Sequence, residues 1–491
     1  MASTLPATLP AAFVTALRAI APGCRVLTQA EQLAPYECDG LAAYRRLPGA
    51  VVLPETEAQL AQALRLCHAH RVPVVPRGAG TGLSGGAMPI TEGIVLSTAR
   101  LNRILSIDPL ARTATVQPGV RNAAISDAVA SHGLYYAPDP SSQLACTIGG
   151  NVAENSGSVH CLKYGLTVHN VLRVRALTMQ GETVDFGSAA PDVPGLDLLS
   201  VVIGSEGMFA IATEITVKLV PKPRTAQVVM ASFDDVEKGG NAVAAIIAAG
   251  IIPAGLEMMD RGAVHAVEKF MRAGYDLSAE AILLCESDGE PEEVAEEIAR
   301  IETVVRDAGA TQCRVSQNEA ERLRFWSGRK NAFPAAGRVA PDYYCMDGTV
   351  PRRSVGPLLR KIRGLGEQYR LGCLNVFHAG DGNMHPLILF DGNDEDQWHR
   401  AEAFGADILE SCVALGGTIT GEHGVGIEKI NSMCVQFSEA EREAFHAVKR
   451  AFDPDGLLNP DKAIPTKARC AEYGRLHVRG GNIPFPGIPR F

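Results

Sequence analysis

PRGAGTGLSGGA, at residues 76–87, contains five glycines in one short stretch. Glycine allows positive φ angles and lets a ligand approach the backbone closely, so this density exceeds what a simple turn needs. Gly80, Gly82 and Gly85 also satisfy the G-x-G-x-x-G pattern of Rossmann domains, but that pattern requires a helix to begin at the third glycine. Here the strand-like run GIVLS follows at 93–97. We therefore predict a loop whose N–H groups bind a pyrophosphate.

Two further segments carry glycine and small polar residues in the same part of the chain. They are TIGGNVAENSGS at 147–158 and GSEGMFAI at 204–211. We predict that both are loops at the edges of β-structure. Three such loops between residues 76 and 211 indicate one long cofactor that the protein contacts at several points along its length.

The composition excludes several classes of protein. The chain has 491 residues, of which 46% are hydrophobic, so it is not globally disordered and has room for about three domains or two large ones. Its formal charge is −9, from 46 Lys and Arg against 55 Asp and Glu. A mildly acidic chain with 5% aromatic residues has no overall basic footprint for nucleic acid.

The 12 cysteines predict neither a metal cluster nor a disulfide scaffold. They lie singly, and no two of them form the C-x-x-C pair that zinc ribbons and iron–sulfur sites use. We expect buried free thiols in a reducing cytosol. The chain is therefore predicted to have no iron–sulfur cluster of its own.

No segment has the pattern of an export signal or a membrane span. Residues 1–23 lack a basic start and carry Arg18 within an apolar stretch, which is typical of an amphipathic helix. The longest apolar run, at 243–255, is too short to span a bilayer and contains Pro253. We expect a cytoplasmic protein that meets the inner face of the cell membrane only peripherally, through partners.

Short β-rich runs alternate with helical runs over residues 50–223. Pro221 and Pro223 then interrupt either kind of element, and a second α+β pattern begins. We therefore predict four segments in chain order: a helical arm (1–49), a cofactor-binding domain (50–223), a substrate-binding domain (224–465) and a loop-like C-terminal extension (466–491).

A histidine–carboxylate pattern predicts a metal site in the second domain. In NVFHAGDGNMHPLILF, at 375–390, a hairpin closed at the glycine-rich turn would make His378 and His385 converge. Glu422, in another glycine-rich loop, supplies a carboxylate, and two histidines with one carboxylate leave positions open for substrate. Zinc suits these ligands, although manganese or iron also fits. The alternative is a polar turn whose histidines bind backbone groups.

Long motifs across nearly the whole chain resemble one group of flavoproteins. They include PDPSSQLACTIGGNVAEN, HCLKYGLTVHN, FWSGRKNAFPA, NVFHAGDGNMHPLILFD and GEHGVGIEK. Residues 50–223 are similar to the FAD-binding domain of the vanillyl-alcohol-oxidase (p-cresol methylhydroxylase) type. The whole chain resembles the FAD-linked oxidases that include the flavin subunits of bacterial glycolate oxidases and the D-lactate and D-2-hydroxyglutarate dehydrogenases.

This resemblance implies an α+β fold with two domains. The first would be a two-part FAD-binding domain, and the second an α+β substrate or cap domain with an antiparallel sheet. The last part of the second domain, about 425–465, would return to the flavin. Relatives with covalent flavin carry a histidine where this chain has Thr81, so the resemblance implies that FAD is bound non-covalently.

The FAD-binding residues of the relatives can be carried over by position. The pyrophosphate would contact Gly78, Ala79, Gly80, Thr81 and Gly82. The remaining cofactor-binding residues lie in matching loops: Pro76, Arg77, Ser84, Gly85, Pro138, Ser141, Gly149, Gly150, Asn151, Gly204, Ser205, Glu206, Gly207, Ile211 and Asn459.

Catalytic roles also follow from the resemblance, which places a divalent metal on the same two histidines and Glu422. His423 would be the general base, which an ordinary histidine pKa of ~6.5 suits. Arg329 matches the arginine that binds the substrate carboxylate through two parallel hydrogen bonds. From the composition of the chain alone, we would instead expect Arg329 to form an ion pair at the surface. Cys345 stands where D-2-hydroxyglutarate enzymes present a lysine for a second carboxylate, so we expect a small monocarboxylate.

The resulting hypothesis is FAD-dependent oxidation of a small 2-hydroxy acid by hydride transfer to flavin N5. Glycolate would give glyoxylate, and D-lactate would give pyruvate. Electrons would pass to a second FAD-binding-type subunit and an iron–sulfur subunit. The alternatives are a self-contained D-lactate dehydrogenase that uses a quinone or a cytochrome, and a non-catalytic FAD scaffold. A metal-dependent hydrolase would leave the glycine loops unexplained.

Overall fold

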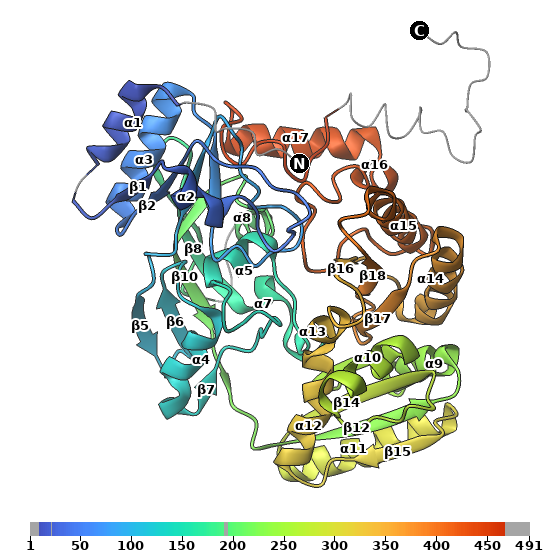
Figure 1. Ribbon diagram of the computed structural model, residues 1–491. Helices are drawn as coiled ribbons and strands as arrows, with labels where there is room; N and C mark the ends of the chain where they lie inside the picture. The colour runs from blue at the N-terminus through green and yellow to red at the C-terminus, as the bar shows by residue number, and fades with distance from the viewer. Residues whose placement is uncertain (1–8, 21, 191–194, 467–491) are drawn as a thin grey trace.

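The protein is described by a computed structural model over residues 9–20, 22–190 and 195–466. Two α+β units lie side by side, one from the N-terminal half of the chain and one from the C-terminal half (Figure 1). All but the first residue of the predicted C-terminal extension, 467–491, lies outside the described residues.

The first sheet of the N-terminal unit leads directly into the glycine-rich stretch. Its order is β1-β2-β4-β3, with β1 antiparallel at the edge and the other three strands parallel. The strands are β1 (Arg25–Leu27), β2 (Ala50–Leu53), β3 (Val74–Arg77) and β4 (Ile94–Ser97). Residues 78–93 contain no helix, and β4 follows them, which confirms the predicted strand and rules out a Rossmann site at this loop.

Two helices cover this sheet. Leu17 of α1 (Ala11–Arg18) packs in one core with Leu64 of α3 (Glu57–His70) and with Val74 of β3. The predicted amphipathic helix is therefore present as α1. Because β1 also pairs with β2, the described residues of the N-terminal arm are part of the body of this unit.

The second sheet of the N-terminal unit is antiparallel and has five strands in the order β5-β6-β10-β8-β9. Helices α4 (Asn122–Val129) and α8 (Leu198–Val202) share its hydrophobic core. The strands are β5 (Ile104–Asp108), β6 (Thr113–Val116), β8 (Val171–Leu177), β9 (Thr183–Gly187) and β10 (Ile211–Lys218).

One predicted loop is wrong. Residues 147–158 were expected to be a glycine-rich loop, but Ile148–Glu154 form the helix α5. Two adjacent glycines disfavour a helix, yet Ile148 and Val152 are buried in the core of the five-stranded sheet, and this packing outweighs the local propensity. Gly149 and Gly150 thus lie in the first turn of a helix rather than in a loop.

The C-terminal unit is built on a seven-stranded antiparallel sheet in the order β15-β12-β14-β13-β17-β18-β16. This arrangement, with the two sheets of the N-terminal unit, is the predicted α+β fold. The strands are β12 (Thr225–Phe233), β13 (Gly255–Asp260), β14 (Ala281–Gly289), β15 (Gln312–Val315), β16 (Asp342–Cys345), β17 (Cys373–His378) and β18 (Pro386–Phe390).

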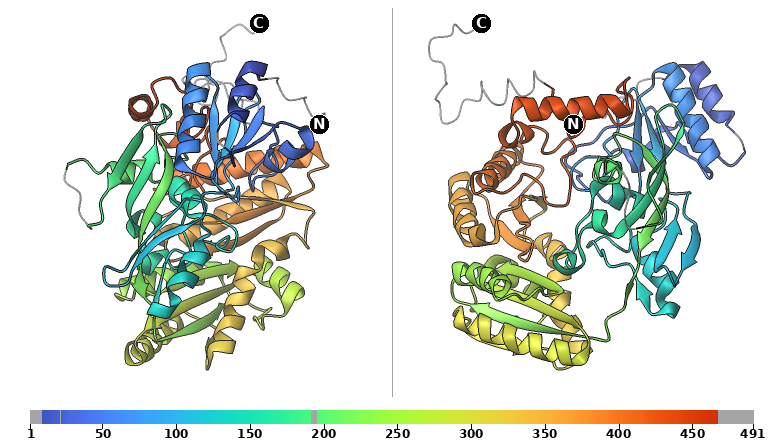
Figure 2. Two further views of the ribbon diagram at one scale, coloured as in Figure 1. Left: turned by 90° about the vertical axis from the view of Figure 1, so that its left-hand side faces the viewer. Right: turned by 180° about the vertical axis from the view of Figure 1, so that it is seen from behind.

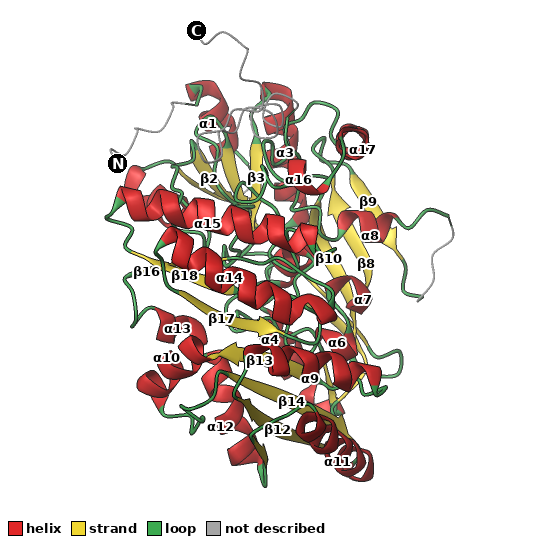
Figure 3. Cartoon of the chain, turned by 90° about the vertical axis from the view of Figure 1, so that its right-hand side faces the viewer, coloured by secondary structure: helices red, strands yellow, loops and turns green. Residues whose placement is uncertain are grey.

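Helices cover both faces of this sheet. The outer face, toward the viewer in Figure 3, packs against α9 (Val236–Ala248), α11 (Pro291–Asp307), α14 (Val355–Tyr369) and α15 (Glu395–Ala414). The opposite face packs against α10 (Arg261–Met271), α12 (Glu319–Lys330) and α13 (Ala332–Ala336). The central strands β13, β14 and β17 are almost entirely buried on both faces, whereas the edge strands β15 and β16 are partly exposed.

After the seven-stranded sheet of the C-terminal unit, the chain returns to the N-terminal unit. Helix α17 (Glu439–Phe452) spans both units, as Figure 2 shows from behind. Phe452 stacks on Phe209 at a ring-centroid distance of 4.9 Å. Beyond the helix, the Asn459 N–H donates to the carbonyl of Val74 over 2.7 Å, which places residues near 459 against the strand that precedes the glycine loop.

A buried ion network also joins the two units. His160, just before α6 (Cys161–Tyr164), contacts Asp139 at 2.9 Å and Glu286 of β14 at 3.4 Å. Glu286 accepts hydrogen bonds from Arg322 over 2.7 Å and from the indole of Trp326, both on α12. Although burial lowers it, the pKa of His160 is raised well above its ordinary value by Asp139 and Glu286. One carboxylate therefore holds α12 and a segment of the other unit together.

Two further sequence predictions can be compared with the described residues. Ten cysteines are free thiols and six of these are buried, but Cys434 is disulfide-bonded, which the prediction of free thiols did not include. Among the described helices, none is both long enough and apolar enough to cross a membrane.

We predict that Glu286→Leu lowers the free energy of unfolding by about 3 kcal/mol, because it removes the buried carboxylate that His160, Arg322 and Trp326 share. Urea unfolding measures the change. The control is Glu290→Leu, which removes an exposed ion pair with Arg224 and should change stability by less than about 1 kcal/mol. Equal effects of the two substitutions would contradict the role assigned to Glu286.

Candidate functional site

One cavity of about 450 Å³ lies between the two units. It is lined by the glycine-rich loop, by α5 and by residues 206–212 on one side, and by α12, α13 and the histidine–carboxylate residues on the other. Most of the predicted cofactor-binding residues line it: Pro76, Arg77, Gly78, Ala79, Gly80, Thr81, Gly82, Ser141, Gly149, Gly150, Asn151, Glu206, Gly207 and Ile211.

At Gly78 the glycine loop approaches the start of α5 so closely that a side chain is excluded. A Cβ atom at Gly78 would lie 2.4 Å from the Thr147 hydroxyl, and Gly80 has a φ of +72°. The Thr147 hydroxyl and the Oε2 atom of Glu154 are buried without a hydrogen-bond partner among the described residues, and both residues line the cavity. Burial, together with nearby Glu206, raises the pKa of Glu154 well above its ordinary value. These polar atoms fit a cofactor that supplies acceptors and donors.

The other predicted cofactor residues do not line the cavity but hold its walls. The Asn459 amide donates to the carbonyls of Gly86 and Glu206, over 2.9 and 2.6 Å. The Ser84 carbonyl accepts from Ile427 N–H over 3.0 Å. The residues of this kind are Ser84, Gly85, Pro138, Gly204, Ser205 and Asn459.

The predicted histidine hairpin is present and its two histidines converge. Strands β17 and β18 pair with Asn375 opposite Pro386, and the rings of His378 and His385 lie 5.0 Å apart between centroids. Glu422 Oε1 lies 3.4 Å from His378 Nε2 and 3.0 Å from His385 Nε2. These separations match the edges of a tetrahedron around a zinc ion with ligand bonds of about 2.0–2.1 Å.

Glu257 of β13 is a residue that the sequence did not reveal. Its carboxylate lies 2.6 Å from His378 Nδ1 and accepts from Arg329 Nε over 2.6 Å. Burial alone would lower the pKa of His378, but Glu257 and Glu422 outweigh it and raise that pKa to about 10. Carboxylates that favour a proton on this ring also favour a divalent cation there, and Glu257 fixes the ring orientation.

Arg329 is buried, whereas the composition of the chain alone favoured an ion pair at the surface. Arg329 is 3% exposed, lies in the last turn of α12, forms a buried ion pair with Glu257, and lines the cavity. The neighbouring Lys330 is exposed, in keeping with a solvated side chain, but it too lines the cavity.

Asp347 is the second residue that sequence reasoning missed. Its buried carboxylate accepts from the backbone N–H groups of Gly421, Glu422 and His423, over 3.1, 3.2 and 3.0 Å. It also accepts from the Asn383 amide over 2.9 Å, in the turn between the two histidines. The one signal in the sequence is an Asp–Gly pair directly after a β-strand. This carboxylate therefore aligns both segments that carry the histidine–carboxylate cluster.

His423 is oriented toward the same cluster. Its Nε2 atom is 3.7 Å from Glu422 Oε1, and its ring stacks on that of His385 at 5.0 Å and 9°. Burial lowers the pKa of His423 to about 4. The ring is therefore neutral at neutral pH and can accept a proton.

Sequence family models match the chain in two places. The FAD binding domain matches residues 48–187, and the C-terminal domain of FAD linked oxidases matches residues 222–463. The chain is 60% identical to the glycolate oxidase subunit GlcD of Escherichia coli K12, over 97% of this chain and 95% of that protein. The chain belongs to the FAD-linked oxidase family. The predicted family, the FAD cofactor and the assignment as an oxidoreductase are confirmed.

More distant members of the FAD-linked oxidase family cover most of the chain as well. The chain is 40% identical to the glycolate oxidase subunit GlcD of Bacillus subtilis, over 88% of this chain and 93% of that protein. It is 32% identical to a D-lactate dehydrogenase of Archaeoglobus fulgidus, over 84% of this chain and 91% of that protein.

Solved structures confirm the predicted fold type. The chain superposes on p-cresol methylhydroxylase with a TM-score of 0.78 and 17% identity, covering 94% of this chain and 98% of that one. For 4-ethylphenol oxidase from Gulosibacter chungangensis the TM-score is 0.79 at 16% identity, with coverage of 95% and 100%. At these identities the likeness shows the fold alone.

Gly157 offers a test of the cluster, because a Cβ atom there would lie 2.4 Å from Glu422 Oε2. We predict that Gly157→Ala displaces Glu422 and weakens zinc binding about 10- to 100-fold, as loss of support around a metal ligand does. Competition with a chelator measures the affinity.

The control for this substitution is Gly364→Ala on α14, where a Cβ atom would meet nothing within 4 Å. Its zinc affinity should equal that of the wild type. Wild-type affinity in Gly157→Ala would show that Glu422 is not a metal ligand.

Proposed function

We propose that the protein oxidises a small 2-hydroxy acid, converting glycolate to glyoxylate and D-lactate to pyruvate. The observation that carries this proposal is that the proposed FAD-binding loops and the cluster of His378, His385, Glu422 and His423 line one shared cavity. An acid bound at the cluster lies within reach of a flavin held by the loops. The 60% identity to the E. coli glycolate oxidase subunit GlcD supports glycolate as the substrate.

The residues that would hold the two cofactors are those of the cavity walls. When bound, FAD would supply a hydride acceptor at N5, and a divalent metal would supply the Lewis acidity that makes the substrate hydroxyl more acidic. His378, His385 and Glu422 would bind the metal, with zinc favoured over manganese or iron. Thr81 replaces the histidine of covalently flavinylated relatives, so FAD would be held by non-covalent contacts alone.

Arg329 would bind the substrate carboxylate. Its Nε atom donates to Glu257, which fixes the guanidinium plane and leaves the terminal nitrogens to form two parallel hydrogen bonds in the cavity. His423, neutral because of its lowered pKa, would accept the hydroxyl proton at Nε2. Apolar Phe333 and Pro334 complete this side of the cavity and suit a hydrogen or a methyl group on the substrate carbon.

The electrons would leave through partner subunits. We propose a second FAD-binding-type subunit and an iron–sulfur subunit, because the cysteines of this chain lack the close pairs that an iron–sulfur cluster needs. The relatives from E. coli and B. subtilis are themselves named as subunits of glycolate oxidase. Association with the inner face of the cell membrane would then occur through the partners.

The second candidate is a self-contained D-lactate dehydrogenase with a quinone or a cytochrome as acceptor, which the A. fulgidus relative favours. A non-catalytic FAD scaffold would have no use for an aligned histidine–carboxylate cluster beside the cofactor loops. Anaerobic bleaching of the flavin separates these possibilities. We predict rapid bleaching by glycolate and D-lactate, and none by L-lactate or D-2-hydroxyglutarate.

Bleaching by D-lactate alone would favour the self-contained dehydrogenase, and bleaching by no acid would favour the scaffold. In the same assay Arg329→Lys should raise KM about 10- to 100-fold, equivalent to about 1.4–2.7 kcal/mol. The control, Arg324→Lys, changes an exposed arginine on the same helix and should leave KM unaltered. An unaltered KM in Arg329→Lys would remove Arg329 from the substrate site.

A further inference from the structure

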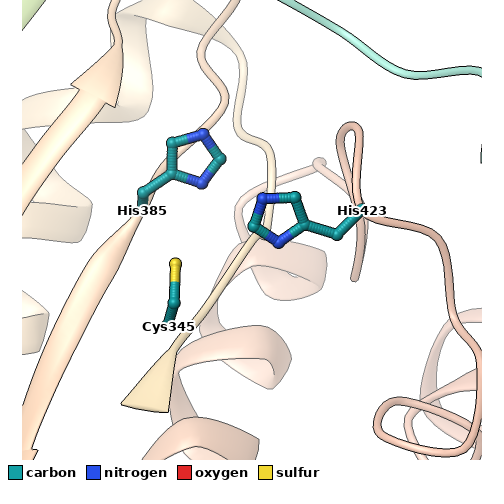
Figure 4. Close-up of side chains that lie close together, drawn as sticks. All are labelled: Cys345, His385 and His423. Atoms are coloured by element: carbon teal, nitrogen blue, oxygen red, sulfur yellow. The ribbon is translucent and has the colours of Figure 1, made fainter. Parts of the chain in front are cut away.

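Cys345 lies beside the histidine–carboxylate cluster but has no part in the mechanism proposed above. The Cys345 sulfur and one ring nitrogen each from His385 and His423 lie within 4.8 Å of one another. Figure 4 shows the three side chains turned toward one another. Cys345 is 8% exposed and His385 is 2% exposed, whereas His423 is partly exposed and lines the cavity together with His385.

In both His385 and His423, the Nε2 and Nδ1 atoms have different surroundings. The Nε2 atoms of His385 and His423 lie toward Glu422, at 3.0 and 3.7 Å from its Oε1 atom. The Nδ1 atom of His385 instead lies 3.4 Å from the carbonyl oxygen of Met346, the residue after Cys345. The Nδ1 atom of His423 is buried and has no hydrogen-bond partner among the described residues. The Nδ1 atom of His385 therefore lies next to the Cys345–Met346 segment, and the Nδ1 atom of His423 is an unsatisfied polar atom in the same group.

We propose that Cys345, His385 and His423 form a second metal site, which takes a thiophilic divalent cation such as cadmium or excess zinc. A thiolate with two imidazoles is a ligand set for soft and borderline metals, whereas two imidazoles and a carboxylate also suit harder ones. On binding, the Cys345 thiol loses its proton to solvent and the sulfur bonds to the cation. No oxidation or reduction is involved.

The tautomers of His385 make this site an alternative to the first one. A neutral imidazole has one lone pair, so it binds one cation at a time. With a cation at Nε2, the proton is on Nδ1 and faces the Met346 carbonyl. With a cation at Nδ1, the proton is on Nε2 and faces Glu422 Oε1, at 3.0 Å. Each tautomer thus has its own acceptor.

Occupation of the second site therefore inhibits the enzyme. It removes His385 from the His378–Glu422 cluster, and it engages His423, the proposed general base. This consequence rests on the proposed function, whereas the existence of the site does not. A thiophilic cation would act as a competitive ligand for the residues that the reaction requires.

Titration of the FAD-loaded enzyme with cadmium tests the site directly. Cadmium bound to a thiolate gives an ultraviolet charge-transfer band, which we expect at one equivalent in the wild type. Cys345→Ser should lack this band and, relative to its own uninhibited activity, need at least about tenfold more cadmium for half-inhibition. The band is read without substrate, so it does not depend on any effect of the replacement on activity.

The control is Cys313→Ser, a half-buried free cysteine on β15 at the far edge of the sheet, which should keep the band. Cys345→Ala repeats the test should the serine variant fold poorly. A band that persists without Cys345, or that also disappears in Cys313→Ser, overturns the site. A band without inhibition overturns the regulatory consequence. Failure of glycolate to reduce the flavin contradicts the proposed function alone, because the band is read without substrate.

Discussion

Two buried carboxylates from different units hold the loop that carries Glu422 and His423. Asp347 of the C-terminal unit accepts hydrogen bonds from the backbone N–H groups of residues 421–423. Glu206 of the N-terminal unit accepts those of Val425 and Gly426, over 2.7 and 2.8 Å. A buried carboxylate is tolerated only when donors surround it, and successive backbone N–H groups supply them here. The loop can take this conformation only when both units are in place.

This constraint explains why the cofactor loops and the histidine cluster share one cavity. Glu206 lies in a segment that lines the proposed FAD site, and its backbone carbonyl accepts from the Asn459 amide. The same residue therefore positions both the proposed cofactor-binding segment and the loop of the histidine cluster. The His160–Glu286 network fixes the two units again at α12, the helix that carries Arg329 in its last turn. The residues proposed to bind substrate and cofactor are thus aligned by contacts between the units.

Features whose chemistry is local in the sequence could be predicted from it. The glycine loop and the hairpin with its two histidines each lie within one short segment, so spacing alone indicated their geometry. Glu257 and Asp347 could not be found in this way, because each acts on residues far along the chain; Glu257 is 121 positions from His378. Helix α5 was misread because its two glycines have poor helix propensity, which the burial of neighbouring apolar residues overcomes. Arg329 was indicated by family resemblance alone, since its helix is rich in charge and gives no signal of burial.

The proposed reaction requires a metal held by the histidine–carboxylate cluster in the same cavity as the flavin. Diffraction at the zinc absorption edge, from crystals of the FAD-loaded enzyme, can locate both. It should show an anomalous peak at about 2.0–2.2 Å from His378 Nε2, His385 Nε2 and a Glu422 oxygen, with the flavin in the same cavity. A glycolate-oxidising enzyme with no metal at these residues, or with the flavin bound outside this cavity, would contradict it.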